Sequence, residues 1–282
     1  ISKVYLGATE VSKIYLGATE VYSSGFGTYV DAMITQANAL SYALPPAATL
    51  TDLQTSLANI GDTILNKLDV LQIYSADTGT EDFCTLNVID PTVFQATLVN
   101  APVLDKDGMI SVSSTASYIN SNFIPSSGSN YTLNDNHFQT DIRNDVTGDL
   151  QQYLGVEDSG VPSSAITALM ERIGREYGSN NDNSGGNAQG IAAGYFLNGL
   201  HSSVRTTSTN YKNYNNSIEY SSRNKTTSGV PTLSMYVGTY NANGGLPIGS
   251  ARPDNQFGFF SAGASLTTAE MTKIKTQIDL YY

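Results

Sequence analysis

Hydrophobic and polar residues alternate along the first 22 positions, and they do so twice in the same order. Residues 2–11 and 12–21 carry one decapeptide, whose two copies differ only at Val4 and Ile14. Alternation with a period of two predicts a short strand in each copy, and the Gly-Ala-Thr that follows predicts a turn. Such short strands are marginal in isolation, so we expect this segment to pair with the rest of the chain or with other subunits. An ordinary hairpin at the edge of a domain is the alternative. The residues expected to mediate assembly or attachment are Val4, Tyr5, Leu6, Ile14, Tyr15 and Leu16.

Helical periodicity replaces this alternation after the glycine-rich residues 22–27. Residues 28–41 predict an apolar helix that ends before Pro45-Pro46. A second helix is predicted from about Thr49, because apolar residues then recur at the spacing of one helical face: Leu50, Leu53, Leu57 and Ile60.

The same phase continues through Ile64, Leu71 and Tyr74, which leaves two interpretations. One is a coiled-coil stalk. The other is a pair of helices divided at Gly61-Asp62, with Asp62 as a cap. The divided pair is favoured, because a glycine within a helix costs about 1 kcal/mol relative to alanine.

Short alternating runs separated by Gly-, Asn- and Ser-rich turns follow from about residue 85, and this spacing predicts an antiparallel β-sandwich or barrel. Residues 163–177 fit either a helix or one or two strands. Thr267 and Glu270 form a capping-box pattern before a C-terminal helix. The predicted strands are 93–99, 117–123, 137–143, 190–196, 202–207, 233–239 and 256–261.

The composition agrees with a mainly β protein. The chain has 282 residues with 18 Tyr, 25 Gly and no Trp, and only 14% of its residues are charged. Its formal net charge of −11 argues against nucleic acid as a partner. Cys84 is the only cysteine, so we expect no disulfide and a buried thiol. The sequence contains no stretch typical of a membrane span or a signal peptide, so we expect synthesis in the cytoplasm and no membrane insertion.

Candidate chemistry is sparse. The pairs Glu81-Asp82 and Glu157-Asp158 are adjacent, whereas glycosidase carboxylates on one strand need alternate positions, so we expect no catalytic residues and no enzyme activity. His137 and His201 are expected to be ordinary core or surface histidines, and we predict no metal site and no cofactor. Tyrosine rings and asparagine amides suit sugars, and the densest such group comprises Tyr211, Tyr214, Asn215 and Asn216.

Several phrases of the sequence, in this order, resemble a family of bacteriophage virion proteins that carry a concanavalin A-like lectin/glucanase domain. The tandem decapeptide also resembles repeats at the start of phage structural proteins. Val88 departs from the family pattern, in which a Trp often follows the Leu-Asn pair. Residues 163–186 match the pattern poorly. The phrases are a helical segment at 65–77, Leu86-Asn87, and residues 96–103, 117–123, 130–138, 199–209 and 259–270.

The resemblance implies a jelly-roll β-sandwich on a head or tail appendage of a virion, with a C-terminal helix. It predicts an attachment segment at 1–22, a helical connector at 23–80 and a sandwich domain at 81–282. The implied partners are other virion proteins, bound through the N-terminus, and a host-surface carbohydrate. A homotrimer is expected from fibre-like appendages in general. The alternative is a stand-alone domain that binds or cleaves carbohydrate.

Overall fold

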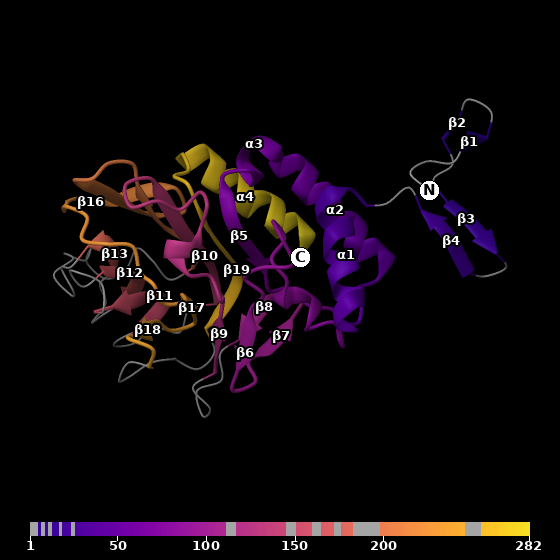
Figure 1. The fold of residues 1–282 in the computed structure, drawn as a ribbon, viewed down its shortest axis with the longest axis horizontal. Coiled ribbons are helices and arrows are strands. Elements are labelled where there is room, and N and C mark those ends of the chain that lie inside the picture. The colour runs from indigo at the N-terminus through magenta and orange to yellow at the C-terminus, as the bar shows by residue number, and fades with distance from the viewer. Residues whose placement is uncertain are drawn as a thin grey trace.

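The computed structural model describes residues 26–110, 117–144, 151–159, 165–171, 176–182, 198–245 and 255–282, together with the backbone of four short strands within residues 5–23. Its elements form three layers: helices, a larger sheet and a smaller sheet (Figure 1). The predicted fold class is therefore confirmed: a mainly antiparallel β-sandwich with a C-terminal helix. The helices are α1 (Thr28–Leu40), α2 (Ala47–Ile60), α3 (Asp62–Leu65) and α4 (Thr268–Tyr281), with short 3-10 turns η1 (Phe83–Thr85) and η3 (Pro125–Ser127).

The larger sheet has eight strands in the order β16-β15-β14-β10-β19-β8-β7, and β5 pairs with β19 beside β8. Its strands are β5 (Leu68–Ile73), β7 (Val103–Asp105), β8 (Gly108–Ile110), β10 (Asn136–Asn144), β14 (Gly199–Arg205), β15 (Asn210–Asn215), β16 (Ile218–Asn224) and β19 (Gln256–Gly263).

The smaller sheet has seven strands in the order β13-β12-β11-β17-β9-β6, and β18 adds to β11 in parallel. Residues 163–177, left open between helix and strand, contribute to β12 and β13. The predicted strand at 190–196 lies outside the described residues. The strands are β6 (Thr97–Val99), β9 (Tyr118–Asn120), β11 (Gln151–Asp158), β12 (Ala165–Glu171), β13 (Glu176–Asp182), β17 (Tyr236–Val237) and β18 (Asn241–Ala242).

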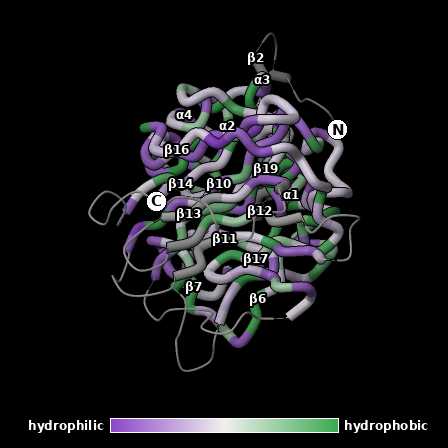
Figure 2. Tube along the Cα trace, turned by 90° about the vertical axis from the view of Figure 1, so that its left-hand side faces the viewer, coloured by the Kyte–Doolittle hydropathy of each residue, from purple (hydrophilic) through white to green (hydrophobic). Residues whose placement is uncertain are grey.

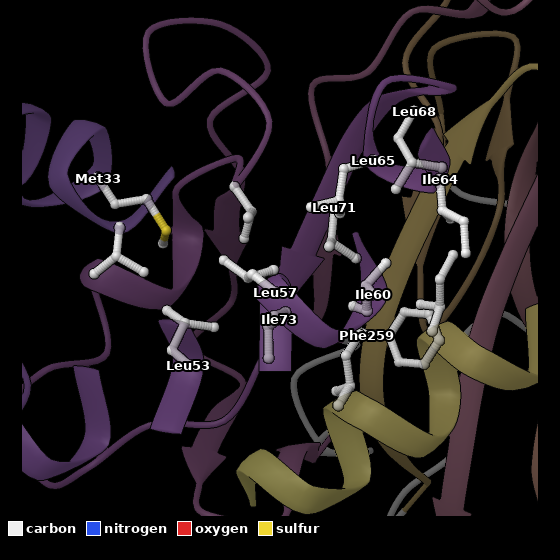
Figure 3. Packing of buried hydrophobic residues seen from close by; sticks show 14 of the residues in the cluster. Met33, Leu53, Leu57, Ile60, Ile64, Leu65, Leu68, Leu71, Ile73 and Phe259 are labelled. Atoms are coloured by element: carbon white, nitrogen blue, oxygen red, sulfur yellow. The ribbon is translucent and has the colours of Figure 1, made fainter. Parts of the chain in front are cut away.

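Two hydrophobic cores hold the layers together. The first lies between the helices and the larger sheet, and it includes Leu53 and Leu57 of α2 together with Leu71 and Phe259 of the sheet (Figure 3). The second lies between the two sheets. Figure 2 shows hydrophobic stretches along the strands of the sandwich, with more hydrophilic stretches on α2 and α4. The larger sheet is thus covered on both faces.

Strand β5 corrects the predicted helix over residues 65–77. All six residues of β5 are buried, with Leu71 and Ile73 in the core under the helices and Val70 in the core between the sheets. A strand buried on both faces loses the apolar-polar alternation that marks a half-exposed strand, and its apolar run then resembles a continuing helix. The coiled-coil stalk is therefore wrong.

The division at Gly61 is confirmed, because α2 ends at Ile60 and α3 begins at Asp62. Gly61 has a φ of 86°, which suits glycine and explains why the helix stops there. Asp62 is the first residue of α3 and not its cap, so that detail of the prediction is wrong.

The predicted C-terminal helix is confirmed with its cap. The Thr267 hydroxyl accepts a hydrogen bond from the Glu270 amide, and the Glu270 carboxylate accepts one from the Thr267 amide at 2.8 Å. Glu270 also meets Lys67 Nζ at 2.6 Å, which ties the start of α4 to the start of β5. Met271, Ile274 and Ile278 then pack on the sheet.

Each N-terminal decapeptide forms its own hairpin. Strands β1 (Tyr5–Leu6) and β2 (Thr9–Glu10) pair within the first copy, and β3 (Lys13–Leu16) pairs with β4 (Thr19–Ser23) in the second. Among the described strand pairs, neither hairpin joins the two large sheets (Figure 1). The strands predicted at Tyr5, Leu6 and residues 14–16 are thus present, and Val4 lies outside the described residues.

The predicted boundary between a helical connector and a sandwich at residue 80 does not coincide with a boundary in the fold. Strand β5 belongs to the larger sheet, and α1 and α2 share a core with β19 and α4. Residues 26–80 therefore contribute α1, α2 and α3 to the helical layer and β5 to the larger sheet.

Candidate functional site

The four residues predicted to bind sugar divide between the two faces of β15 and its following turn. Successive residues of a strand point to opposite faces, and Tyr211 is accordingly 1% exposed, beneath the guanidinium of Arg205 at 5.0 Å. Asn215 is also buried, and its Nδ2 lies 3.1 Å from His201 Nε2. Tyr211 and Asn215 are thus too buried to contact a sugar, which corrects the prediction for these two.

The other two residues of the group reach the surface. Tyr214 is half-buried and packs against the core under the helices. Asn216 is exposed, but its amide already accepts from the Leu200 amide at 3.0 Å and donates to the Asn198 carbonyl at 3.2 Å. Sugar binding by Tyr214 and Asn216 stays a prediction.

Both histidines are buried, in line with a structural role. His137 Nδ1 lies 2.5 Å from the Ala264 carbonyl and its Nε2 lies 3.3 Å from Ser261 Oγ, which in turn accepts from Gln139 Nε2 at 2.9 Å. The carbonyl requires Nδ1 to carry the proton, so Nε2 is the acceptor of a neutral ring. Burial lowers the pKa of His137 to about 4. The ring is thus a neutral link in a buried hydrogen-bond chain.

The depressed pKa of His137 predicts that stability falls on acidification. Between the unfolded pKa of about 6.5 and the folded value of about 4, the unfolded chain binds a proton that the native chain does not. The contribution of the neutral His137 ring to the free energy of unfolding is therefore fully present above pH 6.5. About 3 kcal/mol of this free energy is lost by pH 4. Urea unfolding of the wild type and His137→Gln at pH 7, 5 and 4 measures this difference. An equal pH dependence in both proteins would contradict it.

A β-bulge shapes the most developed polar site of the described residues. Strand β19 has one extra residue opposite β10, where Thr140 pairs with Phe260 and Ile142 pairs with Phe257. Bulges commonly redirect side chains next to functional sites. Gly258 lies within this bulge. A Cβ at Gly258 would lie 2.7 Å from Arg143 Nε and 2.9 Å from Asp141 Oδ2. The glycine makes room for these two charged side chains.

Four charged side chains of β10 and α4 meet beside this bulge. Asp141 Oδ2 lies 3.1 Å from Arg143 Nε and Asp141 Oδ1 lies 3.1 Å from Lys275 Nζ. Asp279 Oδ1 lies 2.9 Å from Arg143 Nη2 and Asp279 Oδ2 lies 2.8 Å from Lys275 Nζ. The Arg143 guanidinium also stacks 3.3 Å above the ring of Tyr282, whose hydroxyl donates to the Gly258 carbonyl. We call Asp141, Arg143, Lys275 and Asp279 the charged cluster.

The charged cluster forms one wall of a pocket of about 460 Å³. Asp141 is almost completely buried, whereas Asp279 is 42% exposed. The pocket wall therefore has a buried ionic part at Asp141 and a more accessible part at Asp279. Its remaining lining comes from Asp107, Ile142, Asn198, Gly199 and Gln256.

The pocket lies next to the turn that contains Asn216. Asn198, which lines the pocket, accepts from Asn216 through its carbonyl. On the other side of the turn, Ser217 Oγ lies 2.5 Å from Thr272 Oγ1 of α4. A second hollow of about 500 Å³ beside α4 is lined by Ser217, Thr268, Ala269, Thr272, Lys273, Thr276 and Gln277. The surface on this side of α4 is thus rich in hydroxyl, amide and charged groups.

The geometry of the charged cluster argues against acid-base catalysis by its carboxylates. All four carboxylate oxygens of Asp141 and Asp279 lie within 3.1 Å of a nitrogen of Arg143 or Lys275. Most glycoside hydrolases use two carboxyl groups that can exchange protons or attack the sugar. Among the described lining residues, Asp107 is the carboxylate that forms no ion pair with Arg143 or Lys275.

This pocket was not predicted from the sequence, although parts of its pattern are present there. Asp141 and Arg143 share a strand face and Lys275 and Asp279 have the i, i+4 spacing of an ion pair, but their meeting depends on long-range packing. No group of three or more His, Cys, Asp and Glu side chains suited to a metal ion occurs in the described part of the chain. Within the same part, no helix is both long and apolar enough to span a membrane.

Comparison with known proteins supports the fold. No family model and no curated protein matches the chain. Among solved structures, a mutant of Trypanosoma rangeli sialidase displaying trans-sialidase activity has a TM-score of 0.53 at 13% identity, over 83% of this chain and 38% of that one. Trypanosoma rangeli sialidase has a TM-score of 0.50 at 11% identity, over 82% and 39%. The botulinum neurotoxin serotype D binding domain has a TM-score of 0.48 at 10% identity, over 76% and 52%. The chain spans about two fifths of the sialidases it resembles, and the likeness establishes a shared β fold.

Proposed function

We propose that this chain is a carbohydrate-binding module that does not cleave its ligand. The observation that carries the proposal is the polar pocket beside α4, where a charged cluster and exposed acceptors surround about 460 Å³. Sugars are recognised by convergent polar side chains that match their hydroxyl groups, and a preformed pocket lowers the entropy lost on binding. The fold likeness to sialidases supports a carbohydrate as the ligand class.

Two features of the pocket favour binding over hydrolysis. The carboxylate oxygens of Asp141 and Asp279 form ion pairs with Arg143 and Lys275, and these ion pairs hold the pocket wall in place. Asp107 is the remaining carboxylate of the pocket. The described lining residues include no second carboxylate outside these ion pairs. We therefore expect saturable binding of an oligosaccharide without release of shorter products.

A glycan array probed with the full chain tests this proposal. The wild type is expected to bind a defined set of oligosaccharides, and the double variant Asp107→Ala/Gln256→Ala is expected to lose that binding, because both residues line the pocket from outside the charged cluster. Asp90→Asn is the matched control, since Asp90 is exposed and lies outside the pocket lining. Binding that survives in the double variant would place the ligand elsewhere, and no binding by the wild type would contradict the proposal.

A second proposal concerns the N-terminal hairpins. We propose that they attach the module to a larger assembly, and that this assembly is a phage virion. The chain would then be a homotrimeric subunit of a head or tail appendage. The supporting observation is that β1 pairs with β2 and β3 pairs with β4, and that neither hairpin joins the two large sheets among the described strand pairs. Their outer backbone groups can then pair with other strands by β-augmentation. The side chains proposed to mediate contact are Val4, Tyr5, Leu6, Ile14, Tyr15 and Leu16.

Removal of residues 1–22 is expected to abolish assembly but leave the sandwich folded, because Val30, Leu53 and the rest of the core under the helices lie after this segment. Light scattering should give three times the monomer mass for the full chain and the monomer mass for the truncated chain. Far-UV circular dichroism of both proteins controls for folding. A monomer in both cases would contradict the trimer.

A further inference from the structure

We infer that the pocket beside α4 selects neutral sugars and rejects acidic ones. This inference rests on the proposed carbohydrate binding, and it names the class of sugar. Its basis is the distribution of charge around the pocket, which is lined by the carboxylates of Asp107, Asp141 and Asp279 and by the cations of Arg143 and Lys275. Carboxylates therefore outnumber cations in the lining.

Both cations of the lining are already neutralised. Arg143 directs Nε to Asp141 and Nη2 to Asp279. Lys275 Nζ lies 3.1 Å from the carboxylate of Asp141 and 2.8 Å from that of Asp279. A sugar carboxylate could reach an N–H of Arg143 or Lys275 only by sharing a cation whose charge is already balanced, or by displacing one of these short contacts. Since Asp141 is almost completely buried, displacing it would leave a buried charge without its partners.

The groups that remain available suit hydroxyls. Asp107 is exposed and accepts hydrogen bonds but cannot donate them when ionised. Gln256 donates one N–H of Nε2 to Asp105 at 3.2 Å, so its carbonyl oxygen remains as an acceptor beside a second N–H. Acceptors of this kind bind the O–H groups of a neutral sugar, whereas they repel a carboxylate or a sulfate.

The charge of the whole protein acts in the same direction. A net charge of −11 creates a negative field that lowers the local concentration of anionic ligands, and the effect is stronger at low ionic strength. Selection against acidic sugars should therefore weaken, without disappearing, as salt is added, because the repulsion from Asp107 acts at short range.

Titration calorimetry with the full chain and two probes tests the inference. The probes are a neutral oligosaccharide found on the array and the same oligosaccharide carrying one uronic or sialic acid unit. We expect the neutral sugar to bind at least about tenfold more tightly, a difference of about 1.4 kcal/mol. Asp107→Asn should reduce this ratio, because it removes a negative charge from the pocket lining. Asp90→Asn, which removes an equal charge from outside the lining, should leave the ratio unchanged.

The outcomes separate the inference from the proposed function. Equal or tighter binding of the acidic probe would overturn the selection for neutral sugars while leaving carbohydrate binding intact. An Asp90→Asn effect as large as that of Asp107→Asn would assign the selection to net charge and overturn the role of the pocket. Failure of the wild type to bind any oligosaccharide would contradict the proposed function itself.

Discussion

Replacing Asp69 with alanine is expected to lower the free energy of unfolding by about 4 kcal/mol. Asp69 lies on β5 and is 8% exposed, and its carboxylate accepts hydrogen bonds from three successive backbone amides of a neighbouring loop. The distances are 2.8 Å to Ser129 N, 2.9 Å to Asn130 N and 2.7 Å to Tyr131 N. Alanine leaves these donors without their charged acceptor, the Tyr131 amide in a buried position and the other two in partly buried ones. An unsatisfied buried donor costs about 1–3 kcal/mol. Urea unfolding at pH 7 measures the loss.

Gly128 provides a sharper control for this contact. A Cβ at Gly128 would lie 2.6 Å from Asp69 Oδ2, so Gly128→Ala should destabilise the wild type. In the Asp69→Ala background the carboxylate is gone, and the same glycine substitution should cost less. A double-mutant cycle therefore predicts a coupling of about 1 kcal/mol between the two positions. Additive effects would contradict the proposed contact.

Replacing Asp141 with alanine is expected to cost about 4 kcal/mol and to disorder the pocket wall. Its side chain is 1% exposed, and it lies between Arg143 and Lys275, which are 18% and 25% exposed. Removing Asp141 leaves these two largely buried cations with the surface residue Asp279 as their remaining carboxylate partner in the charged cluster. The temperature of thermal unfolding and the affinity for the array sugar should both be lower in this variant.

Asp279 is the matched control for Asp141, because it contacts the same two cations from the surface. Its side chain is 42% exposed, so its ion pairs are screened by water and Asp279→Ala should cost only about 0.5 kcal/mol. The contrast between the two aspartates isolates the effect of burial. Equal losses of stability would contradict the interpretation that Asp141 is the buried centre of the charged cluster.

Local signals in the sequence predicted the elements that they determine directly. The capping box at Thr267 and Glu270 and the glycine at position 61 act through neighbouring backbone groups, and both occur where expected. The alternating runs likewise predicted six strands of the two sheets: β6, β9, β10, β14, β17 and β19. Strands β7, β8, β11, β15, β16 and β18 were not among the predicted strands. Strand β5 was missed, since packing on both of its faces removes the alternation on which the prediction depends.

The candidate site could not be predicted in the same way. The sugar-binding group was proposed from the density of Tyr and Asn, but the pleat of β15 turns Tyr211 and Asn215 into the interior. The pocket depends on a bulge at Gly258 and on the docking of α4 over β10, which join residues more than 100 positions apart. Neither the bulge nor the docking has a signature in a single sequence.

The most direct test of the central claim is a crystal structure of the full chain with a neutral oligosaccharide selected on the array. We expect an ordered sugar in the pocket beside α4, with hydroxyl groups within hydrogen-bond distance of Asp107 and Gln256 and with the ion pairs of Asp141 intact. An ordered sugar at another place on the protein, with none in this pocket, would contradict binding at this site.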